Sequence, residues 1–167
     1  MKKTLITTIV AGILVFAVSA EEITHAIGIR TGKGTYGSGF EFSYEEYTDR
    51  DNRIEIGIGV CDQFGVAAVY KWVKPVASNL YWFAGPGAQV RFLADEFGWG
   101  IGGQAGAEYL LELGDWPILI GFDVRPMWGS RDTKVGENDP DWQADEDVYH
   151  TGTGFTFDGA LSLRYAF

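Results

Sequence analysis

Alternation of apolar and polar side chains, repeated along the chain, is the feature that most constrains its fold. From residue 23 onward no segment shows a convincing helical period, whereas a two-residue period recurs eight times between clusters of Gly, Asp, Asn or Pro. Successive side chains of a β-strand point to opposite faces, so each segment predicts a strand with two different faces. The predicted strands are 23–31, 37–48, 53–61, 64–73, 80–93, 97–113, 117–128 and 153–167.

One face of these predicted strands is apolar almost without interruption. It ends on the chain's last residue, because the final segment LSLRYAF places alternate apolar side chains on one side of the strand. The face consists of Ile54, Ile56, Ile58, Val60, Phe64, Val66, Ala68, Tyr70, Trp72, Trp99, Ile101, Ala105, Tyr109, Ile118, Ile120, Phe122, Val124, Leu161, Leu163, Tyr165 and Phe167.

The opposite face carries the charged and amide side chains. It consists of Arg30, Glu41, Glu45, Glu55, Lys71, Gln89, Arg91, Gln104, Glu108, Asp123, Arg125, Asp158 and Arg164. Six acids face five bases there, a near balance that a closed polar interior needs if each charge is to find a partner. We therefore predict a lumen charge network of Arg30, Glu41, Glu55, Lys71, Arg91, Glu108, Asp123, Arg125, Asp158 and Arg164.

A polar interior with an apolar exterior indicates that the solvent outside the barrel is lipid. Soluble lipid-binding barrels have the reverse arrangement, with their apolar face inward. Within lipid only a closed barrel satisfies every backbone group of a sheet, and eight strands suffice to close one whose interior is filled by side chains. The predicted fold is all-β: an eight-stranded antiparallel up-and-down transmembrane β-barrel.

The first twenty residues differ in kind from the rest. Lys2 and Lys3 precede an apolar run over 5–18, and Val18-Ser19-Ala20 resembles a small-residue cleavage site. The run is shorter than the roughly 20 residues of a membrane-spanning helix. We predict an N-terminal signal peptide over 1–20 and a single barrel domain over 21–167.

Net charge excludes one class of partner, and cysteine content excludes an internal cross-link. Removal of the two lysines leaves 11 basic against 23 acidic residues, a formal net charge of −12, which excludes nucleic acid as a natural partner. Cys61 is the only cysteine, so an internal disulfide is excluded.

Aromatic residues are expected to form two girdles near the strand ends, as in outer-membrane barrels. The periplasmic girdle would contain Tyr44, Tyr47, Trp72, Tyr81, Trp82, Tyr109, Trp116, Tyr165 and Phe167, and the outer girdle Tyr36, Phe40, Phe64, Phe92, Phe97, Trp99, Trp128 and Phe155. Tyr81 and Phe83 leave a question open. They face inward if the fifth strand keeps its parity through Gly85-Pro86-Gly87, and outward if a bulge there exchanges the faces.

The chain resembles the small eight-stranded outer-membrane barrel proteins of Gram-negative bacteria. Its ending LSLRYAF is similar to their C-terminal insertion signal, read by the barrel-assembly machinery, and the resemblance assigns this assembly signal to Leu161, Leu163, Tyr165 and Phe167. The order AIGIR, VYKWVKP, FAGPGAQVRF, GIGGQAGAEYLLE, PILIGFDVRPMW and FDGALSLRYAF is similar to uncharacterised barrel proteins of the Bacteroidetes type. The resemblance implies outer-membrane location, outer-membrane lipid as surroundings and no catalytic residues to carry over.

No catalytic, cofactor-binding or metal-binding residue is assigned. The only histidines, His25 and His150, are expected at opposite ends of the barrel, and no serine motif accompanies them. The acidic segment 130–152 is the longest predicted connection; it lacks the glycine of a calcium loop but is a candidate for binding a surface ligand. The first interpretation is therefore a structural or surface-interaction barrel with a non-conducting lumen. The alternatives are a narrow porin and an outer-membrane hydrolase.

Overall fold

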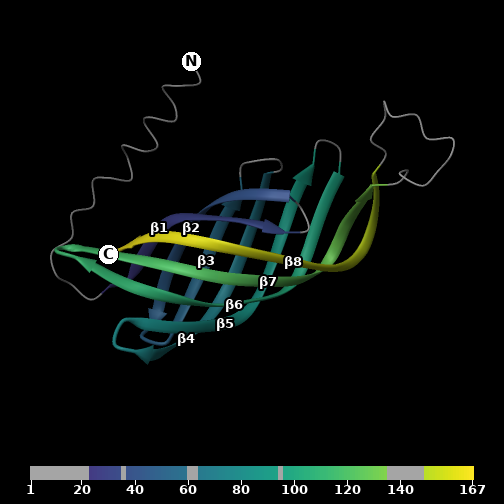
Figure 1. The fold of residues 1–167 in the computed structure, drawn as a ribbon. Helices are drawn as coiled ribbons and strands as arrows, with labels where there is room; N and C mark the ends of the chain where they lie inside the picture. The colour runs from purple at the N-terminus through teal and green to yellow at the C-terminus, as the bar shows by residue number, and fades with distance from the viewer. Residues whose placement is uncertain (1–22, 35–36, 60–63, 94–95, 135–148) are drawn as a thin grey trace, which may run out of the picture.

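A computed structural model describes residues 23–34, 37–59, 64–93, 96–134 and 149–167 as one closed barrel (Figure 1). The predicted signal peptide over 1–20 lies outside the described residues. The eight strands are β1 (His25–Gly34), β2 (Gly37–Asp49), β3 (Asn52–Gly59), β4 (Phe64–Ala77), β5 (Leu80–Leu93), β6 (Glu96–Leu113), β7 (Trp116–Lys134) and β8 (Tyr149–Ala166).

The strands follow one another around the wall in chain order, and every neighbouring pair is antiparallel. Because β1 pairs with both β2 and β8, the sheet has no free edge where the wall closes. The predicted eight-stranded up-and-down barrel is confirmed. No described helix is long and apolar enough to cross a membrane.

The register tilts the strands against the barrel axis. One circuit of paired residues starting at Tyr165 returns to β8 at Phe155, so the register advances by 165 − 155 = 10 residues. With eight strands this advance corresponds to a tilt of about 40°. The circuit is Tyr165, Ile27, Tyr44, Ile56, Ala68, Ala88, Ile101, Trp128 and Phe155.

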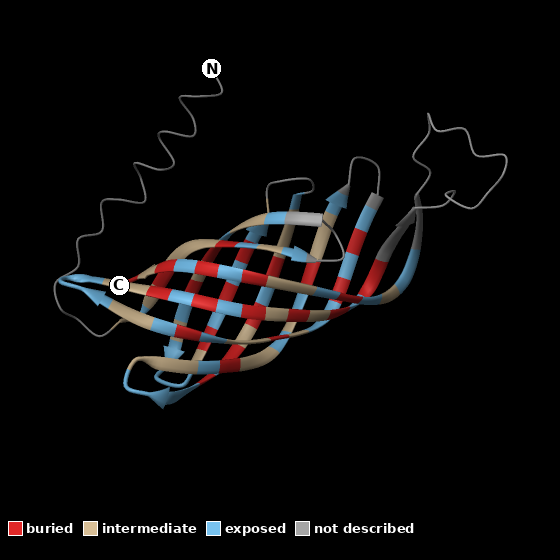
Figure 2. Ribbon diagram, in the orientation of Figure 1, coloured by how far each residue is buried: buried red, intermediate tan, exposed pale blue. Residues whose placement is uncertain are grey.

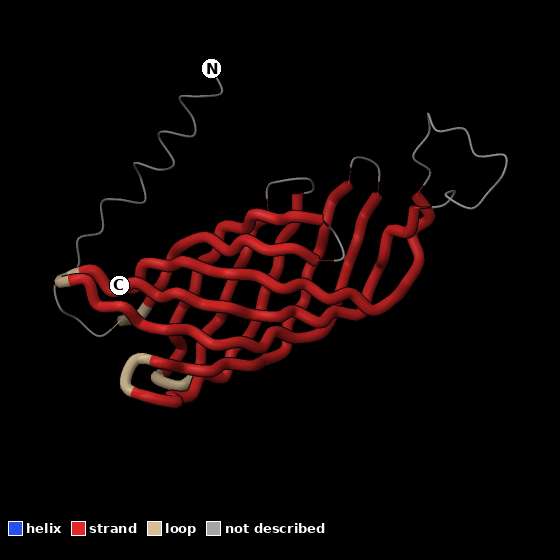
Figure 3. Tube along the Cα trace, in the orientation of Figure 1, coloured by secondary structure: helices blue, strands red, loops and turns tan. Residues whose placement is uncertain are grey.

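The two ends of the barrel differ. At the end that holds His25 and Phe167, here called the terminal end, short turns join β2 to β3, β4 to β5 and β6 to β7 (Figure 3). Gly114 adopts φ = 64° in the last of these turns, a conformation that glycine enters without a Cβ penalty. The opposite end, here called the loop end, holds the other four connections.

The predicted loop over 130–152 is wrong in its extent. Its first and last residues are strand, paired in register from Ser130 with Thr153 to Lys134 with Tyr149. The acidic composition of the segment suggested a loop, whereas its β-branched threonines at both ends extend the hairpin. The remainder, 135–148, lies outside the described residues.

Burial alternates along the strands in step with the pleat (Figure 2). On β3, Arg53 and Glu55 are buried, while their neighbours Ile54 and Ile56 are exposed on the outer wall. The exposed large side chains are Phe42, Ile54, Ile56, Ile58, Phe64, Trp72, Val76, Trp82, Phe92, Phe97, Trp99, Ile101, Tyr109, Leu113, Trp116, Ile120, Phe122, Trp128, Phe155, Phe157, Leu161 and Leu163. The wall is apolar outside.

Two members of the predicted aromatic girdles lie on the inner face instead. Tyr47 shares the inward parity of buried Glu45 and stacks under the guanidinium of Arg53, whose Cζ lies 4.1 Å from the ring centroid. Tyr81 shares the inward parity of buried Phe83. The guanidinium of Arg53 attracts the ring of Tyr47, and side-chain type alone did not reveal this contact.

The question left open at Gly85-Pro86-Gly87 is answered by the register of β5 with β6. Pairing runs without a shift from Leu80 opposite Tyr109 to Leu93 opposite Glu96, so no bulge exchanges the faces. Phe83 therefore points into the lumen, where it is almost fully buried. The register shift along this part of the wall falls between Pro75 and Ala77 instead.

Candidate functional site

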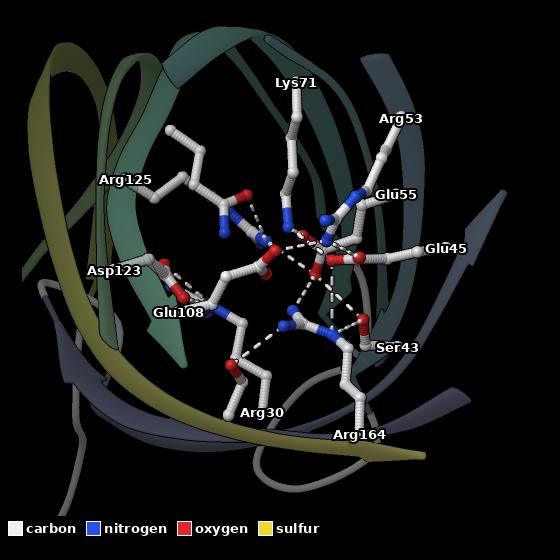
Figure 4. A network of polar contacts seen from close by, with 12 residues as sticks. Arg30, Ser43, Glu45, Arg53, Glu55, Lys71, Glu108, Asp123, Arg125 and Arg164 are labelled. Atoms are coloured by element: carbon white, nitrogen blue, oxygen red, sulfur yellow. Dashed lines mark hydrogen bonds and ion pairs between the residues drawn. The ribbon is translucent and has the colours of Figure 1, made fainter. Parts of the chain in front are cut away.

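Ten charged side chains meet in the lumen and form one connected set, here called the charge network; all of them except Glu41 are labelled in Figure 4. They come from seven of the eight strands, and among the described residues they comprise five acids and five bases. The members are Arg30, Glu41, Glu45, Arg53, Glu55, Lys71, Glu108, Asp123, Arg125 and Arg164.

Glu45 and Glu55 form the centre of the network, one from β2 and one from β3. Lys71 pairs with both; its Nζ lies 2.5 Å from an oxygen of Glu45 and also contacts Glu55. Arg164 of β8 reaches across the lumen to the same two carboxylates, at 3.3 Å from Glu45 and 2.9 Å from Glu55. Ser43 donates to Glu55 at 2.9 Å and accepts from Arg164 Nε at 2.9 Å. Two acids are thus held by two bases and a hydroxyl.

Arg53 is a member that sequence reasoning missed. Its Nη1 lies 3.3 Å from Glu45 and also pairs with Glu108. The predicted strand over 53–61 begins at Arg53, and the predicted polar face does not include this residue. Its spacing of two from Glu55 was the signal that could have placed it inside. With Arg53 the inner face holds six acids and six bases among the described residues, including the Arg91–Asp158 pair.

The loop-end side of the network is built on two arginines. Arg30 binds Asp123 with two nitrogens, at 3.1 Å from Nε and 2.7 Å from Nη2. Arg125 donates to both oxygens of Glu41, at 3.0 and 3.2 Å, and to Gln104 at 3.1 Å. A 3.7 Å contact between Arg125 and Glu55 joins this group to the centre. Such two-pronged arginine pairs fix geometry as well as charge.

Arg91 and Asp158 form a further ion pair nearer the loop end. Their closest charged atoms are 3.8 Å apart, and their side chains are 13% and 19% exposed. Of the ten predicted lumen residues, the structure brings eight into the charge network and pairs the other two with each other.

Apolar side chains complete the filling of the lumen. At the terminal end Ala26, Leu119 and Ala166 form a buried cluster, against which Ile23, Tyr47 and Leu110 pack. Phe83 lies beside the network, with its ring centroid 4.4 Å from Lys71 Nζ. The sequence pattern suggested a uniformly polar inner face, whereas the structure shows a mixed one. The apolar side chains buried there include Ala67, Val69, Val73, Phe83, Leu119 and Met127.

The two histidines lie in strands at opposite ends of the barrel. His25 bonds to Tyr44 through Nδ1, 2.9 Å from the hydroxyl, at the terminal end, and His150 is the second residue of β8, at the loop end. Within the described ranges no group of three His, Cys, Asp or Glu side chains could hold a metal ion. Both carboxylate oxygens of Glu45 face bases.

The predicted assembly signal lies along the seam between β8 and β1. Leu161 and Leu163 are exposed on the outer wall, and Tyr165 stacks on Phe167 at 5.9 Å between ring centroids. The backbone of Phe167 exchanges two hydrogen bonds with His25, both of 2.8 Å. The terminal residue thus closes the seam, while its recognition by an assembly machinery stays a prediction.

Searches of known proteins find resemblance in fold only. No protein-family profile and no curated protein sequence matches the chain. Among solved structures, the chain is similar to a designed transmembrane β-barrel, with 10% identity, a TM-score of 0.55, and coverage of 90% of this chain and 100% of that one. It is also similar to outer membrane protein H (OprH) from P. aeruginosa, with 14% identity, a TM-score of 0.59, and coverage of 86% and 99%. At these identities the likeness establishes that the chain has the fold of an eight-stranded barrel of the outer-membrane type.

Proposed function

We propose that the chain is an integral outer-membrane β-barrel protein with a structural or surface-interaction role and a closed, non-conducting lumen. The exposed apolar outer wall supports insertion into lipid, because a soluble monomer rarely exposes so large a continuous apolar surface. The barrel closure supports the same proposal, since only a closed sheet leaves no unpaired backbone edge in the hydrocarbon.

One observation supports the proposal that the lumen is closed. The side chains of Glu45, Glu55 and Lys71 have no exposed surface at all, and Arg164 is 1% exposed, although all four are charged and lie inside a tube. A water-filled pore would hydrate such groups. Charges this dry require mutual pairing, and their pairing spans the lumen from β2 and β3 to β8.

The orientation and partners of the barrel complete the proposal. The terminal end, with its short turns, faces the periplasm, and the loop end faces outward. Outer-membrane lipid surrounds the wall, and the signal peptide over 1–20 and the ending at Phe167 serve export and the barrel-assembly machinery. Nucleic acid is excluded as a partner by the acidic charge. A porin and a hydrolase are the alternatives.

Solute uptake by vesicles tests the closed lumen. Protein purified from outer membranes and reconstituted into lipid vesicles should not accelerate the entry of small sugars or amino acids. The same preparation should shift in gel mobility on boiling, as a compact barrel does. Rapid solute entry would support the narrow porin, and recovery of the protein in the soluble periplasm would contradict membrane insertion.

Deletion of Phe167 tests the assembly signal separately. Loss of its ring and of its two backbone hydrogen bonds to His25 should lower the yield of folded barrel in the membrane while export continues. Fractionation of cells would measure both steps. An unchanged membrane yield would show that the terminal aromatic residue is incidental.

A further inference from the structure

The backbone ladder between β4 and β5 is interrupted midway along the wall. Pairing stops at Val69 opposite Gly87 and resumes at Trp72 opposite Ala84. The same register places Pro86 in the skipped part, and its ring nitrogen carries no hydrogen. This border of the β5–β6 hairpin therefore lacks a hydrogen-bond donor.

A hydrogen bond on β4 shows which carbonyl lacks that donor. The Val73 N–H donates to the Asp51 C=O at 2.7 Å, beside the start of β3, so odd-numbered residues of β4 face β3 and even-numbered ones face β5. Tyr70 therefore points its C=O at Pro86 on β5 and receives no backbone bond from it. The Tyr70 oxygen lies against Gly85 instead, where an added Cβ would come within 1.7 Å of it. Only glycine allows this approach.

The second interruption lies on the other border of the hairpin. Pairing between β6 and β7 skips the position of Gly103 opposite Pro126. The Leu110 N–H donates to the Asn79 C=O at 2.8 Å, in the turn before β5, so even-numbered residues of β6 face β5 and odd-numbered ones face β7. Gly103 therefore points its C=O at Pro126, which has no N–H to donate. Each border has lost a bond to a proline.

The hairpin itself is paired without interruption. The ladder between β5 and β6 runs from Leu80 opposite Tyr109 to Leu93 opposite Glu96. The hairpin is therefore bonded more completely within itself than to β4 and β7. Proteins open locally in such contiguous units, which keep their internal bonds and part from their neighbours.

Side chains in the lumen span both borders. The ring centroid of Phe83 on β5 lies 4.4 Å from Nζ of Lys71 on β4. Arg125 on β7 donates to Gln104 on β6 at 3.1 Å, and these two residues stand opposite each other in the skipped part of the ladder. Lys71 and Arg125 are in turn held by carboxylates of the charge network (Figure 4). Side chains thus link the wall where its backbone does not.

We propose that the β5–β6 hairpin is a hinged panel of the barrel wall, which opens as a unit along its two proline-interrupted borders and is latched from inside by Lys71 and Arg125. Opening exposes the Tyr70 and Gly103 carbonyls and lets water reach the charge network from the side. The inference goes beyond the proposed function. It depends on the fold and on these contacts, and not on whether the lumen conducts.

Amide hydrogen exchange of the full-length barrel in micelles, resolved by NMR, tests the panel. Alternate residues of β5 and β6 form two groups. The border-facing amides are Ala84, Ala88, Ile101 and Ala105, and the internal amides are Phe83, Gly85, Gln104 and Gly106. After correction for intrinsic rates, the border-facing group should exchange at least about tenfold faster than the internal group. On β1, which is paired on both sides without interruption, the two parities should exchange alike.

Proline variants test the cause of the interruptions. Pro86→Ala and Pro126→Ala each supply the missing N–H, so each should slow exchange at its own border about fivefold and leave the other border within about twofold. Pro75→Ala is the matched control. Its odd position on β4 faces β3, beyond Asn52, where pairing with β3 begins, so it should leave both borders within about twofold. Gel mobility before and after boiling confirms that each variant is folded.

Removal of one latch tests the lumen side chains. Gln104→Leu keeps a side chain of similar size but removes the acceptor for Arg125 across the β6–β7 border. Exchange at this border should rise about fivefold, while exchange at the β4–β5 border should stay within about twofold. Ser43→Ala alters the charge network on β2 without contact to either border and should change neither rate by more than about twofold.

Equal exchange of the two groups of amides, or no slowing in Pro86→Ala and Pro126→Ala, would overturn the proposal. Solute uptake by vesicles that contain the same protein reports the state of the lumen independently. A leaky barrel with alternating exchange would contradict the proposed closed lumen and keep the panel, and a tight barrel with uniform exchange would do the reverse.

Discussion

The inner and outer faces of the barrel wall are made by the same strands, because neighbouring residues of a strand point to opposite faces. On β3 the side chain of Glu55 is fully buried, and that of Ile56 beside it is 43% exposed. In a soluble barrel the arrangement would be reversed, with the apolar side chains inside and the charged side chains outside. The comparison teaches that burial in this molecule does not follow hydrophobicity: charged side chains are buried where they pair with one another, and large apolar side chains are exposed, as the proposed lipid surroundings require.

The largest expected effect comes from removing one base at the centre of the inner face. Lys71→Met keeps a side chain of similar size but removes one of the two bases that pair with both Glu45 and Glu55. Breaking a buried pair in this way typically costs about 3–5 kcal/mol of unfolding free energy. Urea unfolding in lipid vesicles, followed by gel mobility, would measure it.

A matched control for this change lies on the surface. Lys74 pairs with Asp51 at 2.6 Å, but both side chains are 51% exposed. Lys74→Met should therefore cost no more than about 1 kcal/mol. Equal effects of the two lysine variants would mean that the inner charges are hydrated, and the contrast between the faces would fail.

A charge on the outer face should have the next largest effect. Ile56→Arg places a guanidinium against lipid near the middle of β3, where such a change costs about 2–4 kcal/mol. The same unfolding assay applies, with wild type and variant in identical vesicles. A stability unchanged by the arginine would show that this part of the wall is not in contact with hydrocarbon.

A neutral change inside the network should have a smaller effect. Ser43→Ala removes the hydroxyl that donates to Glu55 and accepts from Arg164, but both charged groups keep each other as partners. We expect a loss of about 1–2 kcal/mol. A loss as large as that of Lys71→Met would indicate that hydrogen bonding, rather than charge pairing, holds the inner face.

The smallest effect is expected in a turn at the terminal end, outside both faces. The Asn52 side chain donates to Asp49 at 2.6 Å and the Asp51 N–H at 2.8 Å, and these bonds hold the pKa of Asp49 below its usual value. A depressed pKa contributes stability above the unfolded-state pKa, which is lost as pH falls through the folded-state value. Asp49→Asn should therefore slightly lower the unfolding midpoint at neutral pH. The difference from wild type should shrink as the pH falls below the ordinary pKa of 3.8 and vanish below the lower, folded-state pKa.

The fold could be predicted from the sequence because alternation records both the strand and its two faces. The inward positions of Arg30, Lys71 and Arg164 follow from that period alone. The inward position of Tyr47 was not predicted, because an aromatic side chain suits either face of such a wall. The extension of β7 to Lys134 was not predicted, because the charged residues of this segment suggested a loop in spite of its strand-forming threonines.

Which charges meet could not be predicted from the sequence. Arg30 and Asp123 lie 93 positions apart, and their contact depends on a register advance of ten residues around the wall. Such an advance results from packing of the whole barrel and leaves no local pattern in any one strand. The candidate site was therefore predictable as a set of inward positions, but not as a network of pairs.

Ion conductance across a planar bilayer tests the central claim most directly. If the network and the apolar cluster at the terminal end close the lumen, the refolded protein should insert and leave the bilayer without discrete current steps. Insertion would be verified by protease protection and gel mobility of the same sample. Reproducible single-channel steps from wild-type protein would show that ions pass between Lys71, Arg164 and their carboxylates, and would contradict the account.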